Sequence, residues 1–232
     1  MNENRFFDDG GANAQEKIYA LPFNKSTELL GYNGVFVDYC ETLDPELANI
    51  PRTWGEWEVQ GPKYNTIFTG LMGKKVYGVQ NFEGKASQFE VLAADADAPE
   101  GKQLLLDMAK VDPKTSTLMS WDATDNAFIT LTRQWGAQYT NLPEAEKTKQ
   151  AKKRVGEVLF NSSENQPKVV EMLKFFNKLN KAGIFGTPKA LGGSYSSDAF
   201  AQAKVMFMIC SSGGLSYNTA KWNHRFRVSP IP

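Results

Sequence analysis

Three polar segments of the chain carry residue types that bind hydroxyl-rich ligands. Asn24-Lys25-Ser26-Thr27 stands at the exit of an expected strand, and Ser211-Ser212-Gly213-Gly214 lies between a buried strand and an expected helix. Trp121-Asp122-Ala123-Thr124-Asp125-Asn126 opens another expected helix. Carboxylates accept hydrogen bonds from sugar hydroxyls, and a helix start presents backbone N–H groups to hydroxyls, phosphates or carboxylates. An ordinary turn or helix cap is the alternative for each segment.

Aromatic side chains could pack against the apolar face of a sugar. Trp54 follows Thr53, a good N-cap residue, and we expect it to form a wall of the site. Trp135 recurs with Phe128 and Leu131 at helical spacing, which places it in the core. The candidate ligand-binding residues are Asn24, Ser26, Thr27, Trp54, Asp122, Asp125, Asn126, Ser211, Ser212 and Gly213.

Other chemistry has little support in the sequence. His224 is the single histidine, and its neighbours Asn223 and Arg225 provide no carboxylate for a catalytic triad. Cysteine and histidine are not clustered at zinc-ligand spacing. We therefore expect no catalytic residue, no metal and no cofactor. Cys40 and Cys210 could pair, but two cysteines define no disulfide framework.

The composition is that of a globular protein, with 41% hydrophobic and 22% charged residues among 232. Acidic and basic residues balance at 26 each, so a nucleic acid is not an expected partner. No apolar run approaches the ~20 residues that span a bilayer. Met1 is followed by Asn-Glu-Asn-Arg, which is not a signal peptide, so the protein is intracellular or its true beginning is missing.

Strand-like and helix-like segments alternate along the chain, which predicts an α/β fold with a mixed or largely parallel sheet and helices on both faces. We expect a poorly ordered lead-in over residues 1–16 and a single lobe over 17–232. Val35 to Cys40 fits either a strand or a helix. Strands are expected at 18–21, 28–32, 75–79, 158–160, 204–210 and 226–231. Helices are expected from 53, over 86–94, 103–109, 125–138, 163–183 and 197–203, and after 211–214.

Several motifs, taken in order, resemble those of family 1 extracellular solute-binding proteins of ABC sugar importers. Leu21-Pro22-Phe23-Asn24-Lys25-Ser26-Thr27-Glu28, followed by Tyr32-Asn33, is similar to the strands through which the chain crosses between two lobes. Pro51-Arg52-Thr53-Trp54 resembles a helix start of that family. Val205 to Gly214 and then Phe226 to Pro232 resemble its buried strand, Ser-Ser-Gly turn and return strand. Members that bind glycerol 3-phosphate or oligosaccharides are the most similar.

The resemblance implies one lobe of a type II periplasmic-binding-protein fold, with crossover strands at about 17–33 and 224–232 lying side by side. It implies non-catalytic capture of a sugar or polyol, with or without a phosphate. The partner would be an ABC permease, and the complete precursor would be periplasmic or anchored at the extracellular surface. A monomer is expected.

The chain also departs from the family pattern. A first lobe before the crossover and a helical stretch after the last strand are absent, and Gly31 and Gly34 stand where an aromatic residue and a Lys or Asp are common. Closure over a sugar needs both lobes, so a lobe alone would bind weakly. Two alternatives stay open: a glycan hydrolase using Asp122 and Asp125 as paired acids, and a lobe without useful affinity.

Overall fold

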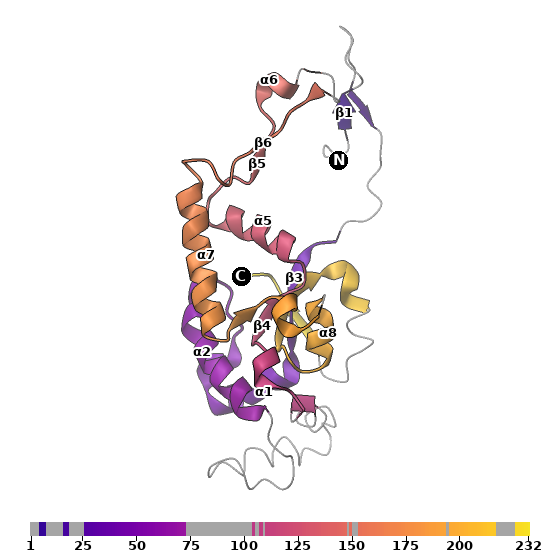
Figure 1. The fold of residues 1–232 in the computed structure, drawn as a ribbon. Coiled ribbons are helices and arrows are strands. Elements are labelled where there is room, and N and C mark those ends of the chain that lie inside the picture. Colours follow the sequence, from indigo (N-terminus) through magenta and orange to yellow (C-terminus); the bar gives the residue numbers. More distant parts are fainter. Residues whose placement is uncertain are drawn as a thin grey trace, which may run out of the picture. The chain divides into compact units, whose positions relative to one another are not determined.

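The computed structural model describes residues 5–7, 16–18, 26–72, 104, 107–108, 110–147, 149, 153–193, 195–216 and 226–232. They divide into two compact units (Figure 1). Unit 1 comprises Met1–Lys25 and Asp125–Phe175, and unit 2 comprises Ser26–Thr124 and Phe176–Pro232. The strand expected at 75–79, the helix expected at 86–94 and most of that at 103–109 lie outside the described residues. The single lobe expected over 17–232 stays a prediction.

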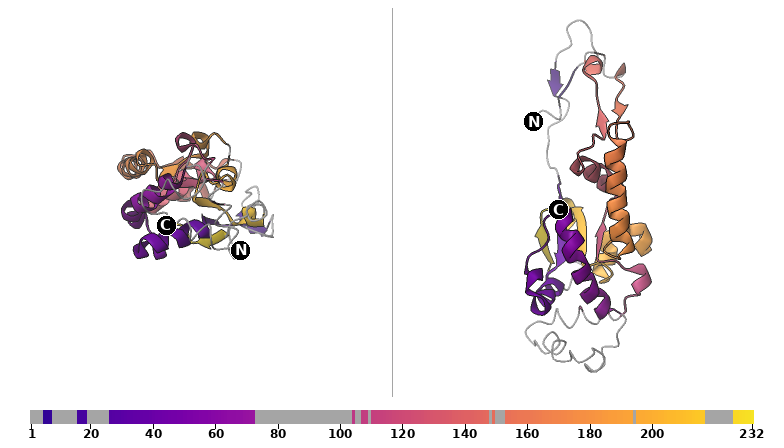
Figure 2. Two further views of the ribbon diagram at one scale, coloured as in Figure 1. Left: turned by 90° about the horizontal axis from the view of Figure 1, so that it is seen from below. Right: turned by 90° about the vertical axis from the view of Figure 1, so that its left-hand side faces the viewer.

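Unit 2 is built on a five-stranded mixed sheet, as the sequence predicted. Its strand order is β7-β4-β8-β3-β9. Strand β4 runs parallel to both β7 and β8, whereas β3 runs antiparallel to β8 and β9. The first and last strands of the unit are therefore neighbours (Figure 2). The bounds are β3 Glu28–Asn33, β4 Met119–Trp121, β7 Phe185–Gly186, β8 Phe207–Ser211 and β9 Phe226–Ser229.

The central strand β8 is covered on both faces because nearly all of its side chains are apolar. On one face, Met208 and Cys210 pack with Phe200 of helix α8 (Ser196–Ala201). On the other face, the ring of Phe207 meets those of Trp57 and Tyr64 in helix α2 at 4.8 and 5.3 Å. Figure 1 shows α2 and α8 on opposite sides of β4. The expectation of helices on both faces of the sheet is confirmed.

Helix α2 (Trp54–Leu71) begins where the sequence predicted. Thr53 and Glu56 form a reciprocal capping box, in which the Glu56 carboxylate accepts the Thr53 N–H and the Thr53 hydroxyl accepts the Glu56 N–H. The helix continues through Pro62. A buried stripe that includes Trp57, Tyr64 and Phe68 offsets the low helix propensity of the proline.

The ambiguous segment at 35–40 is helical and lies within α1 (Gly34–Leu43). Asn33 ends β3 and caps this helix, because its side-chain oxygen accepts the N–H of Phe36 at 2.9 Å. Cys40 and Cys210 are both buried free thiols. Unit 2 also contains the 3₁₀ turns Pro45–Ala48, Pro113–Thr115, Pro188–Leu191 and Ser212–Gly214.

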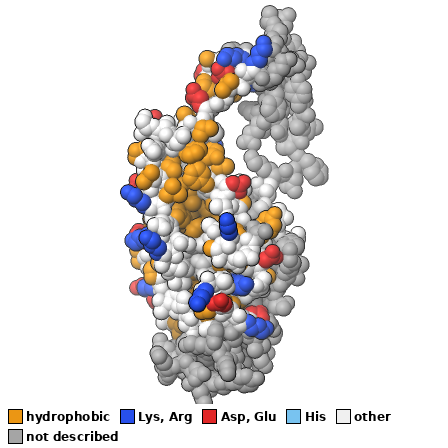
Figure 3. Space-filling view, in the orientation of Figure 1, with side chains coloured by type: hydrophobic (Ala, Val, Ile, Leu, Met, Phe, Trp, Pro, Cys, Tyr) orange, Lys and Arg blue, Asp and Glu red, His pale blue; other side chains and the backbone are white. Residues whose placement is uncertain are grey.

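Unit 1 contains two small antiparallel strand pairs, β1 with β2 and β5 with β6. Its aromatic contacts join Phe128, Tyr139 and Phe160, with ring centroids 5.4 to 6.0 Å apart. Figure 3 shows hydrophobic side chains gathered over the region of α5 and the adjoining part of α7. The bounds are β1 Arg5–Phe7, β2 Glu16–Ile18, α5 Thr124–Gln134, β5 Thr140–Asn141, α6 Glu144–Lys147, β6 Glu157–Val158 and α7 Gln166–Lys181.

Three predicted boundaries were wrong. The strand expected at 158–160 is the exposed pair Glu157–Val158. The helix expected to reach 138 ends at Gln134, because Gly136 adopts a positive φ of 73°. Helix α7 begins three residues after Ser163, and the carbonyl of Asn165 accepts its first intrahelical bond, from Val169. The expected C-terminal glycine is confirmed, since Gly183 has φ 70°.

Candidate ligand-binding site

The start of β3 and the end of β8 are held together by a reciprocal pair of hydrogen bonds. The N–H of Thr27 donates to the Ser212 hydroxyl at 3.0 Å, and the N–H of Ser212 donates to the Thr27 carbonyl at 2.7 Å. A Cβ placed on Gly213 would lie 3.5 Å from the Cβ of Ser26. We call these four residues the rim clasp. Two predicted segments that are 185 residues apart thus meet at one edge of the sheet.

Several amides in and just after the Ser-Ser-Gly-Gly turn already have acceptors within the protein. The Ser212 amide is used in the rim clasp, and the Gly213 amide donates to the Ser211 hydroxyl at 3.2 Å. The Leu215 amide donates to the Ser212 carbonyl. The hydroxyl protons of Ser211 and Ser212 remain able to donate to a ligand. This turn therefore presents the hydroxyl groups of Ser211 and Ser212 to a ligand.

Strand β4 ends at the same edge, since its carboxyl end lies beside that of the parallel strand β8. Alternation along the strand sends consecutive side chains to opposite faces. The Ser120 hydroxyl lies 2.6 Å from that of Ser196 in α8, on one face. Trp121 stacks on Trp54 of α2, on the other. Asp122 points back toward α8, where its Oδ1 accepts the N–H of Ser197 at 3.2 Å.

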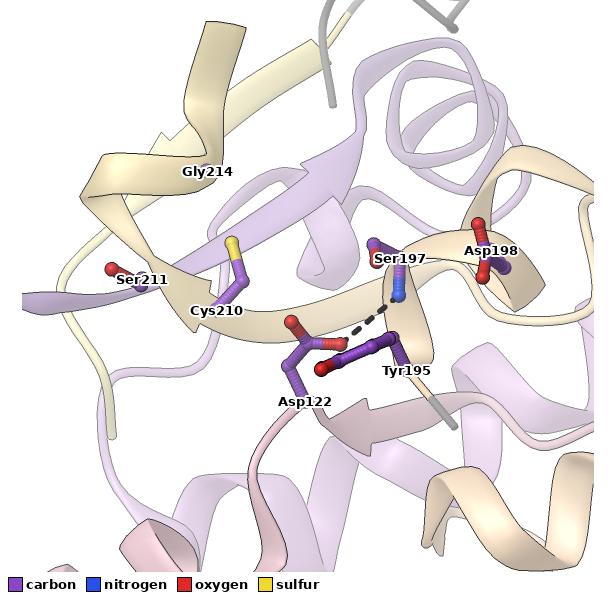
Figure 4. A pocket seen from close by; sticks show the side chains of 7 residues that line it. All are labelled: Asp122, Tyr195, Ser197, Asp198, Cys210, Ser211 and Gly214. Atoms are coloured by element: carbon purple, nitrogen blue, oxygen red, sulfur yellow. Dashed lines mark hydrogen bonds between the residues drawn. The ribbon is translucent and has the colours of Figure 1, made fainter. Parts of the chain in front are cut away.

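A pocket of about 240 Å³ opens between these elements (Figure 4). Asp122 and Ser211 are the lining residues that the sequence predicted. Tyr195, Ser197 and Asp198, at the start of α8, were missed because this short helix follows no motif that indicates ligand contact. The lining residues are Asp122, Tyr195, Ser197, Asp198, Cys210, Ser211 and Gly214.

The pocket has an acidic character. Burial raises the pKa of the Asp122 carboxyl above its ordinary value, and the nearby charge of Asp198 acts in the same direction. The N–H groups of Ser197 and Ser196 oppose this rise by donating to the carboxylate. The site thus combines carboxylate acceptors with hydroxyl groups, which is the pairing that a polyol needs.

Trp54 is a buried residue with 8% of its surface exposed. Its ring stacks on Trp121 at 6.5 Å and meets Phe176 edge-on at 4.8 Å. It therefore belongs to the core on the α2 face of the sheet, whereas the pocket lies on the α8 face. The exposed aromatic side chain at the pocket is Tyr195, with 59% of its surface exposed. A ligand-binding role for Trp54 stays a prediction.

The remaining candidates are not grouped with this pocket. Asp125 and Asn126 are exposed residues in the first turn of α5 and belong to unit 1. Asn24 lies outside the described residues. Within the described part of the chain, no group of three potential metal ligands occurs. No helix there has both the length and the apolar character to cross a membrane.

Comparison with known proteins supports the fold. No family model and no curated protein matches the chain. Among solved structures, UgpB from Mycobacterium tuberculosis, in complex with glycerophosphocholine, matches 93% of this chain with a TM-score of 0.53 and 15% identity. The ABC substrate-binding protein Lmo0181 from Listeria monocytogenes, in complex with cycloalternan, matches 88% with a TM-score of 0.49 and 15% identity.

The chain spans 39% of the length of the UgpB chain and 36% of that of Lmo0181. At 15% identity the likeness to UgpB concerns the fold. The predicted mixed α/β fold of the periplasmic-binding-protein type is confirmed.

Proposed function

We propose that this chain is the ligand-binding part of a solute receptor that captures a sugar or polyol without changing it chemically. The observation that carries the proposal is the meeting of the rim clasp and the acidic pocket at one edge of a mixed sheet. In open α/β sheets, ligands bind at the carboxyl ends of parallel strands, where the connections diverge. Strands β4 and β8 end at this edge, and Asp122 and Ser211 stand at their ends.

The chemistry of the edge suits a polyhydroxylated ligand. A sugar hydroxyl is both a donor and an acceptor, so it can donate to the Asp122 carboxylate and accept from the Ser211 hydroxyl. The Tyr195 ring supplies a surface for an apolar sugar face. Ser26 and Thr27 would contribute from the neighbouring strand.

The motifs at 21–33 and 226–232, which resemble crossover strands, support a proposal for the protein partner and the cellular compartment. Their resemblance to solute-binding proteins supports an ABC permease as the partner, and a complete protein that acts at the outer side of the membrane. The receptor would act as a monomer, and a second lobe would complete the clamp over the sugar.

Saturation-transfer NMR on the full chain with a panel of mono- and oligosaccharides tests the proposal, because it detects millimolar affinities. We expect saturation transfer to at least one sugar, and its loss in Asp122→Asn. Asp112→Asn is the matched control: Asp112 is exposed, its carboxylate accepts the Lys114 N–H, and it is not among the residues that line the pocket. Saturation transfer to no sugar, or equal transfer in wild type and Asp122→Asn, would contradict the proposal.

The competing hydrolase hypothesis has one observation in its favour, although with a different pair of acids. Asp198, rather than Asp125, shares the pocket with Asp122, and the pKa of Asp122 is raised, as in a general acid. Incubation with fluorescently labelled oligosaccharides separates the two functions. We expect the labelled oligosaccharides to remain intact, and release of shorter products would favour the hydrolase.

A further inference from the structure

The charge of the pocket bears on a question that the sequence left open, whether the ligand carries a phosphate. Two of the lining residues, Asp122 and Asp198, are acidic, and no lysine or arginine is among the residues that line the described pocket. A phosphate at this position would face two carboxylates. Proteins bind phosphate through cations or through free backbone N–H groups.

Three backbone N–H groups at this edge, among the residues that the structure describes, already have acceptors within the protein. The Ser197 amide donates to Asp122, the Ser212 amide to Thr27, and the Gly213 amide to Ser211. Each of these donors is committed to an acceptor within the protein. An anionic ligand would have to displace such a bond or rely on hydroxyl donors alone, whereas a neutral hydroxyl or an ammonium group meets acceptors directly.

Tyr195 adds a second feature that points in the same direction. It immediately precedes α8, is largely exposed and borders the pocket beside Asp122 (Figure 4). An aromatic face attracts the apolar C–H face of a sugar ring, and it also attracts a cation through its quadrupole. At about 240 Å³ the pocket is smaller than typical drug-sized sites of roughly 300–1,000 Å³, so it suits one sugar ring.

Resting on the proposed function, we propose that Tyr195 and Asp198 define the ligand class of this pocket as a monosaccharide-sized polyol that is uncharged or carries an amino group. Phosphorylated polyols are rejected. Tyr195 provides the aromatic platform, and Asp198 acts with Asp122 to select by charge. Neither Tyr195 nor Asp198 was a candidate from the sequence.

The test compares three probes of the same ring that differ in charge: glucosamine, glucose and glucose 6-phosphate. The full chain is titrated at constant ionic strength while the Ser197 amide resonance, which reports on its bond to Asp122, is followed by NMR. We expect glucosamine and glucose to bind, and glucose 6-phosphate to bind at least about tenfold more weakly.

Two variants assign the effect to residues. Asp198→Asn should reduce the ratio of the affinity for glucosamine to that for glucose 6-phosphate by about fivefold or more, because it removes one charge at constant shape. Tyr195→Ala should weaken the binding of glucose, and it should weaken that of glucosamine by at least the same factor, because the ring also attracts an ammonium group. Asp112→Asn, which does not alter a pocket-lining residue, should change neither this affinity ratio nor the individual affinities. In the wild-type protein, added NaCl should reduce the same affinity ratio. This measurement does not depend on whether a variant folds.

The outcomes separate this inference from the proposed function. Glucose 6-phosphate binding as tightly as glucose, or a ratio that neither Asp198→Asn nor salt changes, would overturn the inference and leave sugar capture intact. Absence of a saturable shift with all three probes, together with no saturation transfer from the wider sugar panel, would overturn the proposed function and this inference with it.

Discussion

Trp121 and Asp122 are neighbours in the sequence, yet they belong to two different surfaces of the sheet in unit 2. On the α2 face, Trp121 joins Trp54 and Phe176 in a closed aromatic cluster. On the α8 face, Asp122 opens into a pocket with the exposed ring of Tyr195. Trp54 and Trp121 thus pack in the core on the α2 face, and Tyr195, which follows no motif, borders the pocket on the α8 face.

The difference shows that strand alternation, rather than residue type, decides which face of the sheet Trp121 and Asp122 occupy. A one-residue change of register in β4 would exchange the two roles. The pairing of Met119 with Phe207 and of Trp121 with Ile209 in β8 defines that register. Substitutions on the two faces should therefore have different consequences, chiefly for stability on one and for binding on the other.

The largest effect is expected on the closed face. Trp57→Ala removes a fully buried ring that packs on Phe207 and Tyr64, and it should lower the free energy of unfolding by about 3–5 kcal/mol. Urea unfolding followed by circular dichroism measures this loss. Val59→Ala, on the exposed side of the same helix, should stay within about 0.5 kcal/mol of wild type. Equal losses in the two variants would contradict the assigned faces.

Gly31→Ala tests the packing of the two crossover strands. A Cβ at Gly31 would lie 2.6 Å from the ring of Phe226, which itself packs edge-on against Phe200. The ring must move, and we expect a loss of about 1–3 kcal/mol in urea unfolding. Gly55→Ala is the control of opposite sign, because its nearest neighbour is 4.0 Å away and alanine favours the helix. A stabilising Gly31→Ala would disprove this arrangement of β3 and β9.

Ser212→Ala tests the rim clasp. The Thr27 N–H would lose its acceptor at an exposed position, so the expected loss is about 0.5–1.5 kcal/mol, mostly local. Hydrogen exchange of the Thr27 amide should accelerate, whereas that of Leu30 in the same strand should change less. Ser163→Ala, an exposed serine in unit 1, serves as the control. Unchanged exchange at Thr27 would mean that the clasp does not form in solution.

The smallest effect concerns the pH dependence of Asp122. Its folded-state pKa is raised above 3.8, so its contribution to stability is full below pH 3.8 and is lost as pH rises through the folded pKa. Asp122→Asn removes the buried charge. We expect a slightly higher Tm for the variant at pH 7 and a difference that shrinks as pH falls toward 3.8. The raised pKa would be contradicted if the Tm of Asp122→Asn minus that of wild type were smaller at pH 7 than at pH 3.8.

Much of the fold could be predicted because its elements have strong local signals. The apolar run before Cys210 indicated a buried strand, and Thr53 with Glu56 marks the start of α2. The segment at 35–40 was ambiguous because six apolar-rich residues fit either period. Pro62 disfavours a long helix by its own propensity, and the tertiary packing of Trp57 and Tyr64 sustains α2 through it.

The site was predictable only in part, for a physical reason. Ser26, Ser212 and Asp122 follow or precede recognisable strands, so their common edge could be inferred from topology. Tyr195 and Asp198 reach the pocket because α8 packs on β8 through Phe200, a tertiary contact with no local sequence pattern. Likewise, whether the Trp54 ring faces a ligand or packs against Trp121 depends on the register of β4 beside β8. No single segment of the sequence determines that register.

The most direct test of the account is an amide and indole NMR titration of the full chain with a neutral monosaccharide. We predict that the backbone resonances of Ser197 and Ser211 shift in a saturable manner, while the indole N–H resonances of Trp57 and Trp121 on the α2 face stay in place. Saturable shifts confined to those indoles, with Ser197 and Ser211 unchanged, would contradict a ligand site on the α8 face.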